Sequence, residues 1–452
     1  MTFFYYYVNI LADVKFLKRM MFMKNILDPN FRKIKSTEGK DYTIPQVDLS
    51  VKPDGIDPKF DYLYELVTVD KQKPYQAHPD SVLLKNGNIL CMYPAGHGKG
   101  AVMTKISTDG GRSWTEELKN SPKSWETSRE TPTVYRLQFT DSKTNDKIVM
   151  VSGNPKWPNE PTCGGFNYSI SSDEGETWTE FDLVFDKKSD FPIIPIVALA
   201  SLTQLKENGK FVDKWMGFFH DSNFHNYKTI LTFDENGKPH WSKPEKYFKA
   251  HRDYEASSNM CEVEVIRSDA GKGDELCLIS RSNTKKINSL ISFSQDEGKT
   301  WSRPVEVPPA LNGERHKADY THDGRLFITF RSIERGPRAE KTAIQHWSSE
   351  GWVAWVGTFD DLKNHREGQY RIKLAHTYLK NQTAPAYSAN ADTGYCGNVV
   401  LDDGTIVTAT YGIFDNTDIV ISTRDNKREG RTYIASKRIR LEDTDELVKM
   451  VK

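Results

Sequence analysis

Hydrophobic and polar residues alternate along this chain in short runs, and three of the runs lead into the same polar pattern. The runs are rich in β-branched and aromatic side chains and lie at 101–106, 166–170 and 289–293. Each precedes an octad with Asp third, Gly fifth and Trp last, at 107–114, 171–178 and 294–301. Asp accepts backbone hydrogen bonds, Gly takes the left-handed conformation, and Trp packs under the turn. The pattern therefore predicts β-strands that end in tight turns.

The octads are part of a longer repeat. Three degenerate copies extend the series, so that six aspartates recur at intervals of 61 to 65 residues: Asp109, Asp173, Asp234, Asp296, Asp360 and Asp425. A unit of this length fits one four-stranded antiparallel sheet with its loops, which is the blade of a β-propeller. The sequence predicts an all-β fold, a six-bladed β-propeller of four-stranded antiparallel blades.

The repeats set the domain organisation. We expect one propeller domain over 46–452 and a lead-in segment over 1–45 that is partly helical or loosely ordered. The apolar run at 3–12 has no basic residue before it and no small-residue cleavage site after it, and it is too short to span a membrane. Translation from Met20, Met21 or Met23 is the alternative to a loosely attached helix. We expect a cytoplasmic protein.

Composition narrows the range of partners. The chain carries 62 Lys and Arg against 62 Asp and Glu, so it lacks the basic excess of a protein that coats nucleic acid. We therefore expect no nucleic-acid partner, and the absence of a long apolar run argues against a membrane partner. Five cysteines without a CxxC pair indicate free thiols rather than disulfides or a zinc site. We expect neither a metal nor a cofactor.

The octads resemble the Asp-box of sialidases (neuraminidases), and the chain is similar to that superfamily over roughly residues 60 to 440. We predict a structural role for the octads, because their Asp, Gly and Trp all serve turn geometry and packing. The resemblance implies a glycoside hydrolase that acts on a non-reducing terminal acidic sugar with a Tyr nucleophile. In a propeller the loops at one end of the channel converge, so site residues should lie at strand ends.

The segment 394–406 resembles the sialidase segment in which a Tyr opens a strand that ends in a Leu-x-Asp-Gly turn. By this resemblance Tyr395 is the nucleophile. A phenol has a reference pKa near 10 and needs a neighbouring carboxylate as base. The resemblance implies Glu262 for that role, with Glu264 in reserve because strand alternation places both on one face. A packed strand-end Tyr and a solvated strand Glu are the structural alternatives.

Three arginines are candidates for holding the carboxylate of the sugar. Arg281 and Arg331 follow similar β-rich runs in successive repeats, and Arg315 precedes the second of these runs. The resemblance implies that Arg281 and Arg331 are part of a carboxylate-binding triad. Planar guanidinium groups suit bidentate capture of a carboxylate better than Lys does. Exposed arginines that only link blades are the alternative.

Two parts of the sialidase pattern are missing. His78 stands where the first arginine of the triad would be, and the loop at 93–101 lacks the usual acid/base Asp. The titratable residues nearby are His78, Asp80, His97 and Lys99. We expect His97, His78 or Asp80 to replace the acid, because His is the usual general acid/base near pH 7.

Secondary candidates also lie at predicted strand ends. Arg129 and Glu130 follow the first octad, and His220, Asp221 and His225 form a polar group in the third repeat. The His spacing does not match the HExxH pattern of a helical zinc site, so we do not expect a metal there.

Three functions remain open at this point. The first is the sialidase-like hydrolase. The second is a uronate- or deoxysugar-directed glycosidase or lyase on the same propeller, with His as acid/base. The third is a propeller that binds carbohydrate without turnover, since a fold constrains chemistry only loosely.

Overall fold

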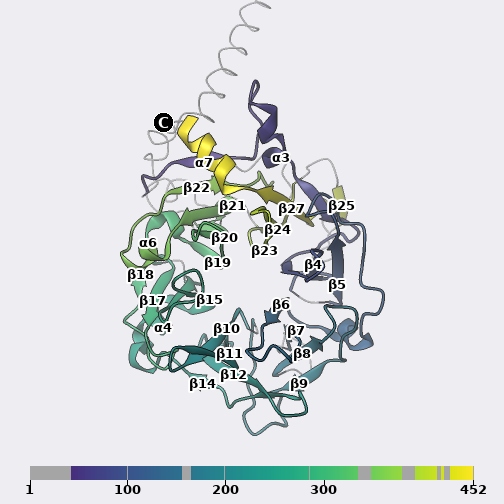
Figure 1. The fold of residues 1–452 in the computed structure, drawn as a ribbon, viewed down its shortest axis with the longest axis vertical. Coiled ribbons are helices and arrows are strands. Elements are labelled where there is room, and N and C mark those ends of the chain that lie inside the picture. Colours follow the sequence, from purple (N-terminus) through teal and green to yellow (C-terminus); the bar gives the residue numbers. More distant parts are fainter. Residues whose placement is uncertain are drawn as a thin grey trace, which may run out of the picture.

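Six sheets surround a central axis (Figure 1). The computed structural model describes residues 42–98, 100–154, 164–197, 199–284, 286–333, 348–378, 392–414, 419–421 and 428–450. In each sheet the strands pair antiparallel from an inner strand at the axis outward, apart from one parallel strand added to an outer edge. The prediction of a six-bladed propeller with four-stranded antiparallel blades is confirmed.

The first five blades follow one another along the chain. The first blade has β3 (Asp80–Leu83), β4 (Ile89–Pro94) and β5 (Val102–Ser107), and an isolated antiparallel bridge pairs Ile106 with Glu116 at its outer edge. The second has β6 (Pro132–Leu137), β7 (Lys147–Gly153), β8 (Phe166–Ser171) and β9 (Asp182–Val184). The third has β10 (Ser201–Glu207), β11 (Lys210–His220), β12 (Asn226–Phe233), β13 (Pro239–Trp241) and β14 (Glu245–Lys246).

The fourth blade has β15 (Met260–Arg267), β16 (Leu276–Ser282), β17 (Leu290–Ser294) and β18 (Val305–Glu306). The fifth has β19 (Gly313–Tyr320), β20 (Leu326–Ile333), β21 (Ser348–Gly357) and β22 (Tyr370–Lys373), with β1 (Gln46–Asp48) added in parallel at its outer edge. A separate hairpin pairs β25 (Ile419–Ile421) with β26 (Arg428–Gly430).

The sixth blade closes the ring. It combines β23 (Gly397–Val400), β24 (Ile406–Gly412) and β27 (Tyr433–Ile439) with β2 (Val67–Asp70), which precedes the first blade in the sequence. The carboxylate of Asp70 also accepts hydrogen bonds from Gln76 and from Tyr93 of β4, both 2.6 Å long. Strand β2 therefore ties the last blade to the first.

Neighbouring inner strands are also linked directly at the axis. The amides of Val134, Val265 and Ala318 donate to side-chain oxygens of the preceding blade, namely Asp80, Ser201 and Glu264. Gly397 has no room for a Cβ, which would lie 2.5 Å from the amide nitrogen of Ser81. These contacts hold neighbouring inner strands in fixed positions around the axis.

The octads form the predicted turns. In the third octad the carboxylate of Asp296 accepts from the Thr300 amide at 2.8 Å and from the Ser294 hydroxyl at 2.8 Å. Of the degenerate copies, Asp234 accepts two backbone amides in the turn between β12 and β13. Asp360 instead lies in α6 (Phe359–Lys363), where Thr358 and Asp361 form a capping box. Asp425 lies outside the described residues.

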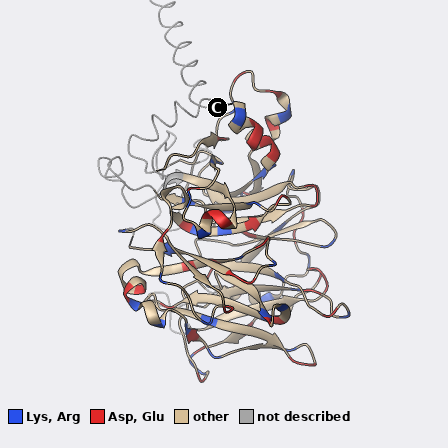
Figure 2. Cartoon of the chain, turned by 60° about the vertical axis from the view of Figure 1, so that its left-hand side comes forward, with Lys and Arg blue, Asp and Glu red and all other residues tan. Residues whose placement is uncertain are grey.

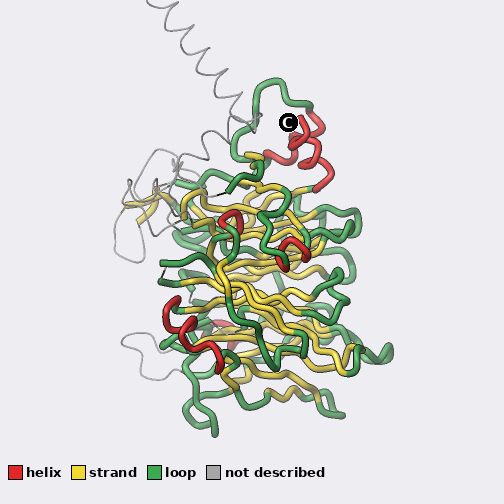
Figure 3. Tube along the Cα trace, turned by 90° about the vertical axis from the view of Figure 1, so that its left-hand side faces the viewer, coloured by secondary structure: helices red, strands yellow, loops and turns green. Residues whose placement is uncertain are grey.

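The remaining elements lie around the strand framework (Figure 3). They are the helices α3 (Asp61–Tyr64), α4 (Arg252–Ser258) and α7 (Leu441–Met450) and the 3-10 turns Pro58–Phe60, Lys123–Thr127, Lys249–His251 and Pro309–Leu311. Within the described part, no helix is long and apolar enough to cross a membrane. Figure 2 shows basic and acidic positions interspersed over the visible loops, in keeping with 62 residues of each sign.

The lead-in segment is mostly outside the described residues, which start at Tyr42. Tyr42 is buried and stacks under the guanidinium of Arg371 in β22, 4.4 Å from the ring centre. The boundary between lead-in and propeller at 45/46 stays a prediction.

Candidate active site

Three of the predicted site residues occupy left-handed backbone positions where inner strands begin. His78 has φ of 53°, Glu262 of 47° and Arg315 of 54°. In the fourth and fifth blades these positions coincide with register shifts, so Glu262 and Arg315 sit in β-bulges. Bulges re-aim side chains, and a non-glycine residue with positive φ costs of order 1–3 kcal/mol. The chain therefore carries local strain at one end of three inner strands.

Tyr395, Glu262 and Arg281 meet at this end of the axis. The Tyr395 hydroxyl donates to Oε2 of Glu262 at 2.8 Å, and the Arg281 guanidinium reaches the same carboxylate oxygen at 2.9 Å. Arg281 also donates to the Tyr395 hydroxyl. Residues from the sixth and fourth blades, 133 positions apart in the sequence, thus form one hydrogen-bonded cluster.

Burial and charge fix the protonation of this cluster. Burial raises the pKa of Glu262, but the Arg281 and Arg315 guanidinium groups outweigh it and lower that pKa to about 2. Burial raises the pKa of Tyr395 well above its usual value, although Arg281 opposes the shift. At neutral pH Glu262 is a carboxylate and Tyr395 a phenol, so the proton lies on the tyrosine oxygen.

Glu264 does not share this position. The bulge at Glu262 interrupts strand alternation, so the expectation that both glutamates face one way does not hold. The Glu264 carboxylate accepts from the Ala318 amide of the next inner strand, β19, at 3.2 Å. Burial raises its pKa to about 7, with Lys317 opposing.

Arg331 lies beside the Tyr395 ring, 4.7 Å from the ring centre, and its guanidinium is fully engaged by the chain. It donates to Glu314 at 2.9 Å, to Tyr411 at 2.7 Å and to the Thr393 carbonyl at 2.6 Å. Its Nη2 also lies 3.4 Å from Asp392. Glu314 contacts Arg281 as well, at 3.2 Å. Two of the three predicted clamp arginines are therefore neutralised by carboxylates of the protein.

Arg315 differs from these two. Its Nη1 is buried and has no hydrogen-bond partner among the described residues. The group is close enough to interact electrostatically with Tyr135, Glu262, Asp80 and Tyr395. Nε of Arg281 is also buried without a partner, but Arg281 has ion pairs with Glu262 and Glu314, whereas Arg315 has no ion pair with a carboxylate among the described residues.

His78 packs in the middle of the aromatic side of the site. Its ring centre lies 5.0 Å from that of Tyr395 and 4.8 Å from that of Tyr411, whose hydroxyl is 3.1 Å from Nε2. Burial lowers the pKa of His78 well below its usual range, and His97 lowers it further. His78 is therefore neutral and cannot replace the positive charge of an arginine.

His97 and Asp80 differ in burial: the side chain of His97 is partly exposed, and that of Asp80 is buried. His97 is 42% exposed in its side chain, and its Nδ1 lies 2.6 Å from the Tyr75 hydroxyl and 3.6 Å from Asp392. Asp80 is buried in β3, where it binds the Val134 amide and forms an ion pair with Lys317 at 3.3 Å. Asp80 is part of the axis framework, and both roles expected of it, replacement of the missing acid and contact with substrate, stay predictions.

Four residues of the site were not predicted from the sequence. Glu314, Tyr411, Tyr75 and Asp392 complete the network around the arginines. Glu314 and Asp392 lie close in sequence to candidates already chosen, Arg315 and Tyr395, and this proximity was the available signal. Their cross-blade pairing depends on bulge geometry, which a single sequence does not display.

Of the secondary candidates, Glu130 lies next to the site at the start of β6. Burial raises its pKa to about 8, while hydrogen bonding from Thr131 opposes the shift. His220 is buried, and burial lowers its pKa to about 4. Asp221 and His225 pair with each other at 3.0 Å. Among the described residues, no three His, Cys, Asp or Glu side chains are placed to hold a metal ion.

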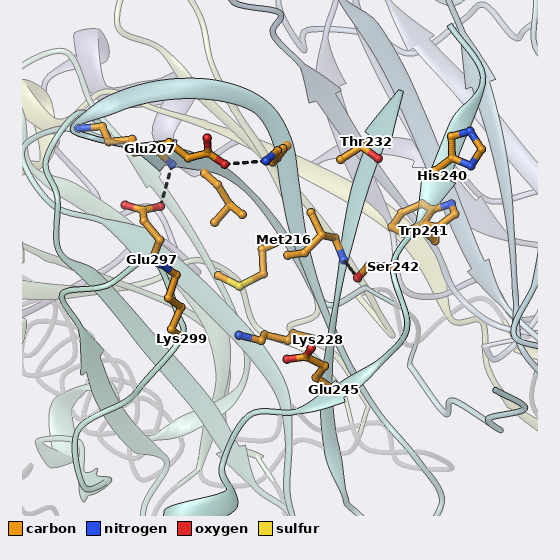
Figure 4. Close-up of a pocket in the computed structure, with 14 residues that line it drawn as sticks. Glu207, Met216, Lys228, Thr232, His240, Trp241, Ser242, Glu245, Glu297 and Lys299 are labelled. Carbon is orange, nitrogen blue, oxygen red and sulfur yellow. Dashed lines mark hydrogen bonds and ion pairs between the residues drawn. The ribbon is translucent and has the colours of Figure 1, made fainter. Parts of the chain in front are cut away.

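A groove of about 490 Å³ lies elsewhere, across the strands of the third blade and beside the octad of the fourth (Figure 4). Its charged side chains are mostly engaged: Lys214 pairs with Glu207 at 2.6 Å, and Lys228 donates to the Gly298 carbonyl at 2.8 Å. None of the predicted site residues lines it.

The six blades with their octad turns define a propeller of the sialidase-like type. The chain belongs to the family of BNR repeat-like domains, whose model matches residues 87–370. No curated protein matches the sequence.

Solved structures share the fold at low sequence identity. A Dyadobacter fermentans protein of unknown function has a TM-score of 0.53 at 15% identity and covers 83% of this chain and 97% of its own. The α-L-arabinofuranosidase of Fusarium graminearum in complex with arabinobiose gives 0.54 at 11% identity, with 84% and 97% covered. The Penicillium chrysogenum α-L-arabinanase complexed with arabinobiose gives 0.51 at 12%, with 84% and 98% covered.

Proposed function

We propose that this protein is a glycoside hydrolase that removes a non-reducing terminal sugar, with Tyr395 as nucleophile. The observation that carries the proposal is the 2.8 Å hydrogen bond from the Tyr395 hydroxyl to the Glu262 carboxylate at the end of the axis. A nucleophile within hydrogen-bond reach of its base, with a third group orienting the pair, is the arrangement that covalent catalysis needs. Arg281 is that third group.

In this mechanism Tyr395 attacks the anomeric carbon while Glu262 takes the phenolic proton. The pKa difference between the two groups disfavours a free tyrosinate, so proton transfer accompanies the attack instead of preceding it. The Arg281 guanidinium holds both oxygens in place. Water then hydrolyses the glycosyl-tyrosine, and Glu262 returns the proton to the phenol.

The pairing of the arginines supports a neutral terminal sugar. A sugar carboxylate would have to displace Glu314 from Arg281 and Arg331, and the third clamp position holds the neutral His78. Breaking such buried ion pairs is costly. The arabinobiose complexes of the structural neighbours show that this fold accommodates neutral pentoses in those proteins.

An acidic terminal sugar is the second candidate, and Arg315 is the observation that favours it. One unpartnered guanidinium nitrogen could bind one carboxylate oxygen. Aryl glycosides of a neutral pentofuranose, a sialic acid and a uronic acid separate the candidates by which chromophore is released. An unsaturated uronide product would indicate the lyase alternative, and binding without release would indicate a lectin-like propeller.

The nucleophile is tested with Tyr395→Phe on the substrate that this panel identifies. We expect kcat to fall about 1000-fold or more, because no other group can form the covalent intermediate. Tyr411→Phe is the matched control: it removes a buried hydroxyl from the same cluster and leaves the proposed nucleophile intact. Turnover by Tyr395→Phe within ten-fold of the wild type would rule out the mechanism.

A further inference from the structure

The reaction proposed above needs a proton donor for the departing sugar oxygen, and the histidines nearby are poorly suited. His78 is buried and neutral, with its Nε2 facing Tyr411. His97 is bound through Nδ1 to Tyr75. Glu262 is ionised and faces the nucleophile. A group that carries a proton at neutral pH must come from elsewhere at this end of the axis.

Glu130 lies just before the inner strand of the second blade begins, at the same end of the axis as the cluster. It follows the turn Lys123–Thr127 and precedes β6 (Pro132–Leu137), an inner strand of the propeller. Its side chain is close enough to interact electrostatically with both Glu262 and Arg315. Glu130 belongs to the second blade, whereas Tyr395 belongs to the sixth and Glu262 to the fourth, so its carboxyl approaches the cluster from a different blade.

The surroundings of Glu130 keep the group neutral. Glu130 is only 5% exposed, and its Oε1 accepts from the Thr131 amide at 2.8 Å. The loop at 95–98 passes directly over the carboxyl, since a Cβ on Gly98 would lie 3.4 Å from Oε1. No Lys, Arg or His of the described ranges forms an ion pair with it, whereas Glu262 and Glu314 each have an arginine. A buried carboxyl without a cation retains its proton.

We propose that Glu130 is the general acid/base of this site, a role that rests on the proposed function. In the first step its carboxyl proton passes to the glycosidic oxygen as the bond to the anomeric carbon breaks and Tyr395 forms the new bond. In the second step the Glu130 carboxylate takes a proton from the water that attacks the anomeric carbon. Glu130 is thereby restored, and the phenolic proton returns from Glu262 to Tyr395.

The test is Glu130→Gln on two glycosides of the same sugar, one with a good leaving group and one with a poor one. For the poor leaving group we expect kcat/KM to fall about 100- to 10000-fold, because only that substrate needs protonation in the first step. For the good leaving group the fall stays below about ten-fold. Azide should accelerate turnover of the good substrate and yield a glycosyl azide, because it replaces the water that Glu130 would activate.

The pH profile gives a second readout. Activity of the wild type falls as pH rises through the pKa of Glu130, about 8, because the acid must be protonated in the free enzyme. Within the described part of the chain, Glu262 and Arg315 are the charged groups that act on Glu130, and neither titrates in this range. Glu130→Gln should lose this alkaline limb, and Glu130→Asp should retain it with lower activity.

Glu126→Gln, in the turn preceding Glu130, is the control and should match the wild type on both glycosides. Equal losses on both glycosides, or no loss on the poor one, would overturn the proposal. Failure of the proposed function looks different, because Tyr395→Phe would then stay active or no glycoside would be cleaved. In that case the infrared band of a protonated carboxyl at neutral pH, present in the wild type and absent in Glu130→Gln, still tests the buried acid.

Discussion

Three neighbouring arginines of this site differ in their hydrogen-bond and ion-pair partners, and we expect them to differ in role. Arg331 has four acceptors from three segments of the chain, and Arg281 is held by Glu262 and Glu314. Arg315 sits on a strained bulge with a buried nitrogen unpaired. Strain and an unsatisfied donor are both unfavourable for folding, and they occur together where a ligand can compensate for them. The first two arginines are held in the cluster by carboxylates, whereas the third has no such ion pair among the described residues.

This difference predicts opposite results for two equivalent substitutions. Arg331→Met should lower the free energy of unfolding by about 3–5 kcal/mol, because it leaves buried partners without their cation. Arg315→Met should cost clearly less, because no hydrogen bond is lost and Glu262 keeps Arg281 as its cation, yet it should raise KM on the preferred glycoside. Denaturant titration and steady-state kinetics measure both. A large loss of stability in Arg315→Met would show that this residue is structural.

At the scale of elements, each of the three octads joins its own blade to the one before it. Gly111 faces Val407 of the sixth blade, Gly175 faces Leu90 of the first, and Gly298 faces Met216 of the third. The Trp114 indole donates to the Ser436 hydroxyl at 2.9 Å, again in the sixth blade. The turns therefore act as inter-blade contacts at the end of the strands away from the axis cluster.

Substitutions at two octad glycines can distinguish the effect of the inter-blade contact on stability from the effect of backbone strain. Gly111 and Gly175 have φ of 82° and 87°, so an Ala at either position carries a similar strain of about 1–2 kcal/mol. A Cβ at Gly111 would lie 2.7 Å from Val407, whereas one at Gly175 would make an ordinary 3.7 Å contact. Gly111→Ala should therefore be less stable than Gly175→Ala by a further 1–3 kcal/mol or so. Equal melting shifts would contradict this.

Repetition explains which features the sequence could predict. Six aspartates at near-constant spacing predicted six blades, and resemblance to a known segment led to Tyr395 and Glu262, which the fold brings together. The spacing of the aspartates did not show that Asp360 lies in a helix, α6, which is capped by Thr358. Nor did it show the bulges that turn Glu262 away from Glu264, or the pairing of Arg331 with Glu314, because these depend on backbone geometry and contacts between blades.

At the scale of the whole molecule, the site exists only while the ring is closed. Tyr395 belongs to the sixth blade and Glu262 to the fourth, and the ring is completed by β2 pairing with β27. The hydrogen bond between the proposed nucleophile and its proposed base joins two different blades. Stability of the closure and activity should therefore be coupled, even though β2 carries no residue of the site.

Asp70 of β2 tests this coupling. Its Oδ2 accepts from Tyr93 and Gln76, and its Oδ1 accepts from the Gln72 amide at 2.9 Å. Asp70→Ala leaves two buried donors unpaired, each at a cost of about 1–3 kcal/mol, so we expect a loss of roughly 3 kcal/mol or more. Amide exchange should accelerate in β24 and β27 first, and activity should fall at temperatures where the wild type is stable.

Asp48 of β1 provides the comparison, because β1 adds to the outer edge of the fifth blade without closing the ring. Asp48→Ala removes the acceptor of the Ser50 amide, 2.9 Å away, and should leave exchange in β24 and the kinetics unchanged. If Asp70→Ala and Asp48→Ala proved equally mild, closure of the ring would not depend on the hydrogen bonds of Asp70. If Asp70→Ala alone uncoupled the sixth blade, the active site would be a property of the closed ring and not of any one blade.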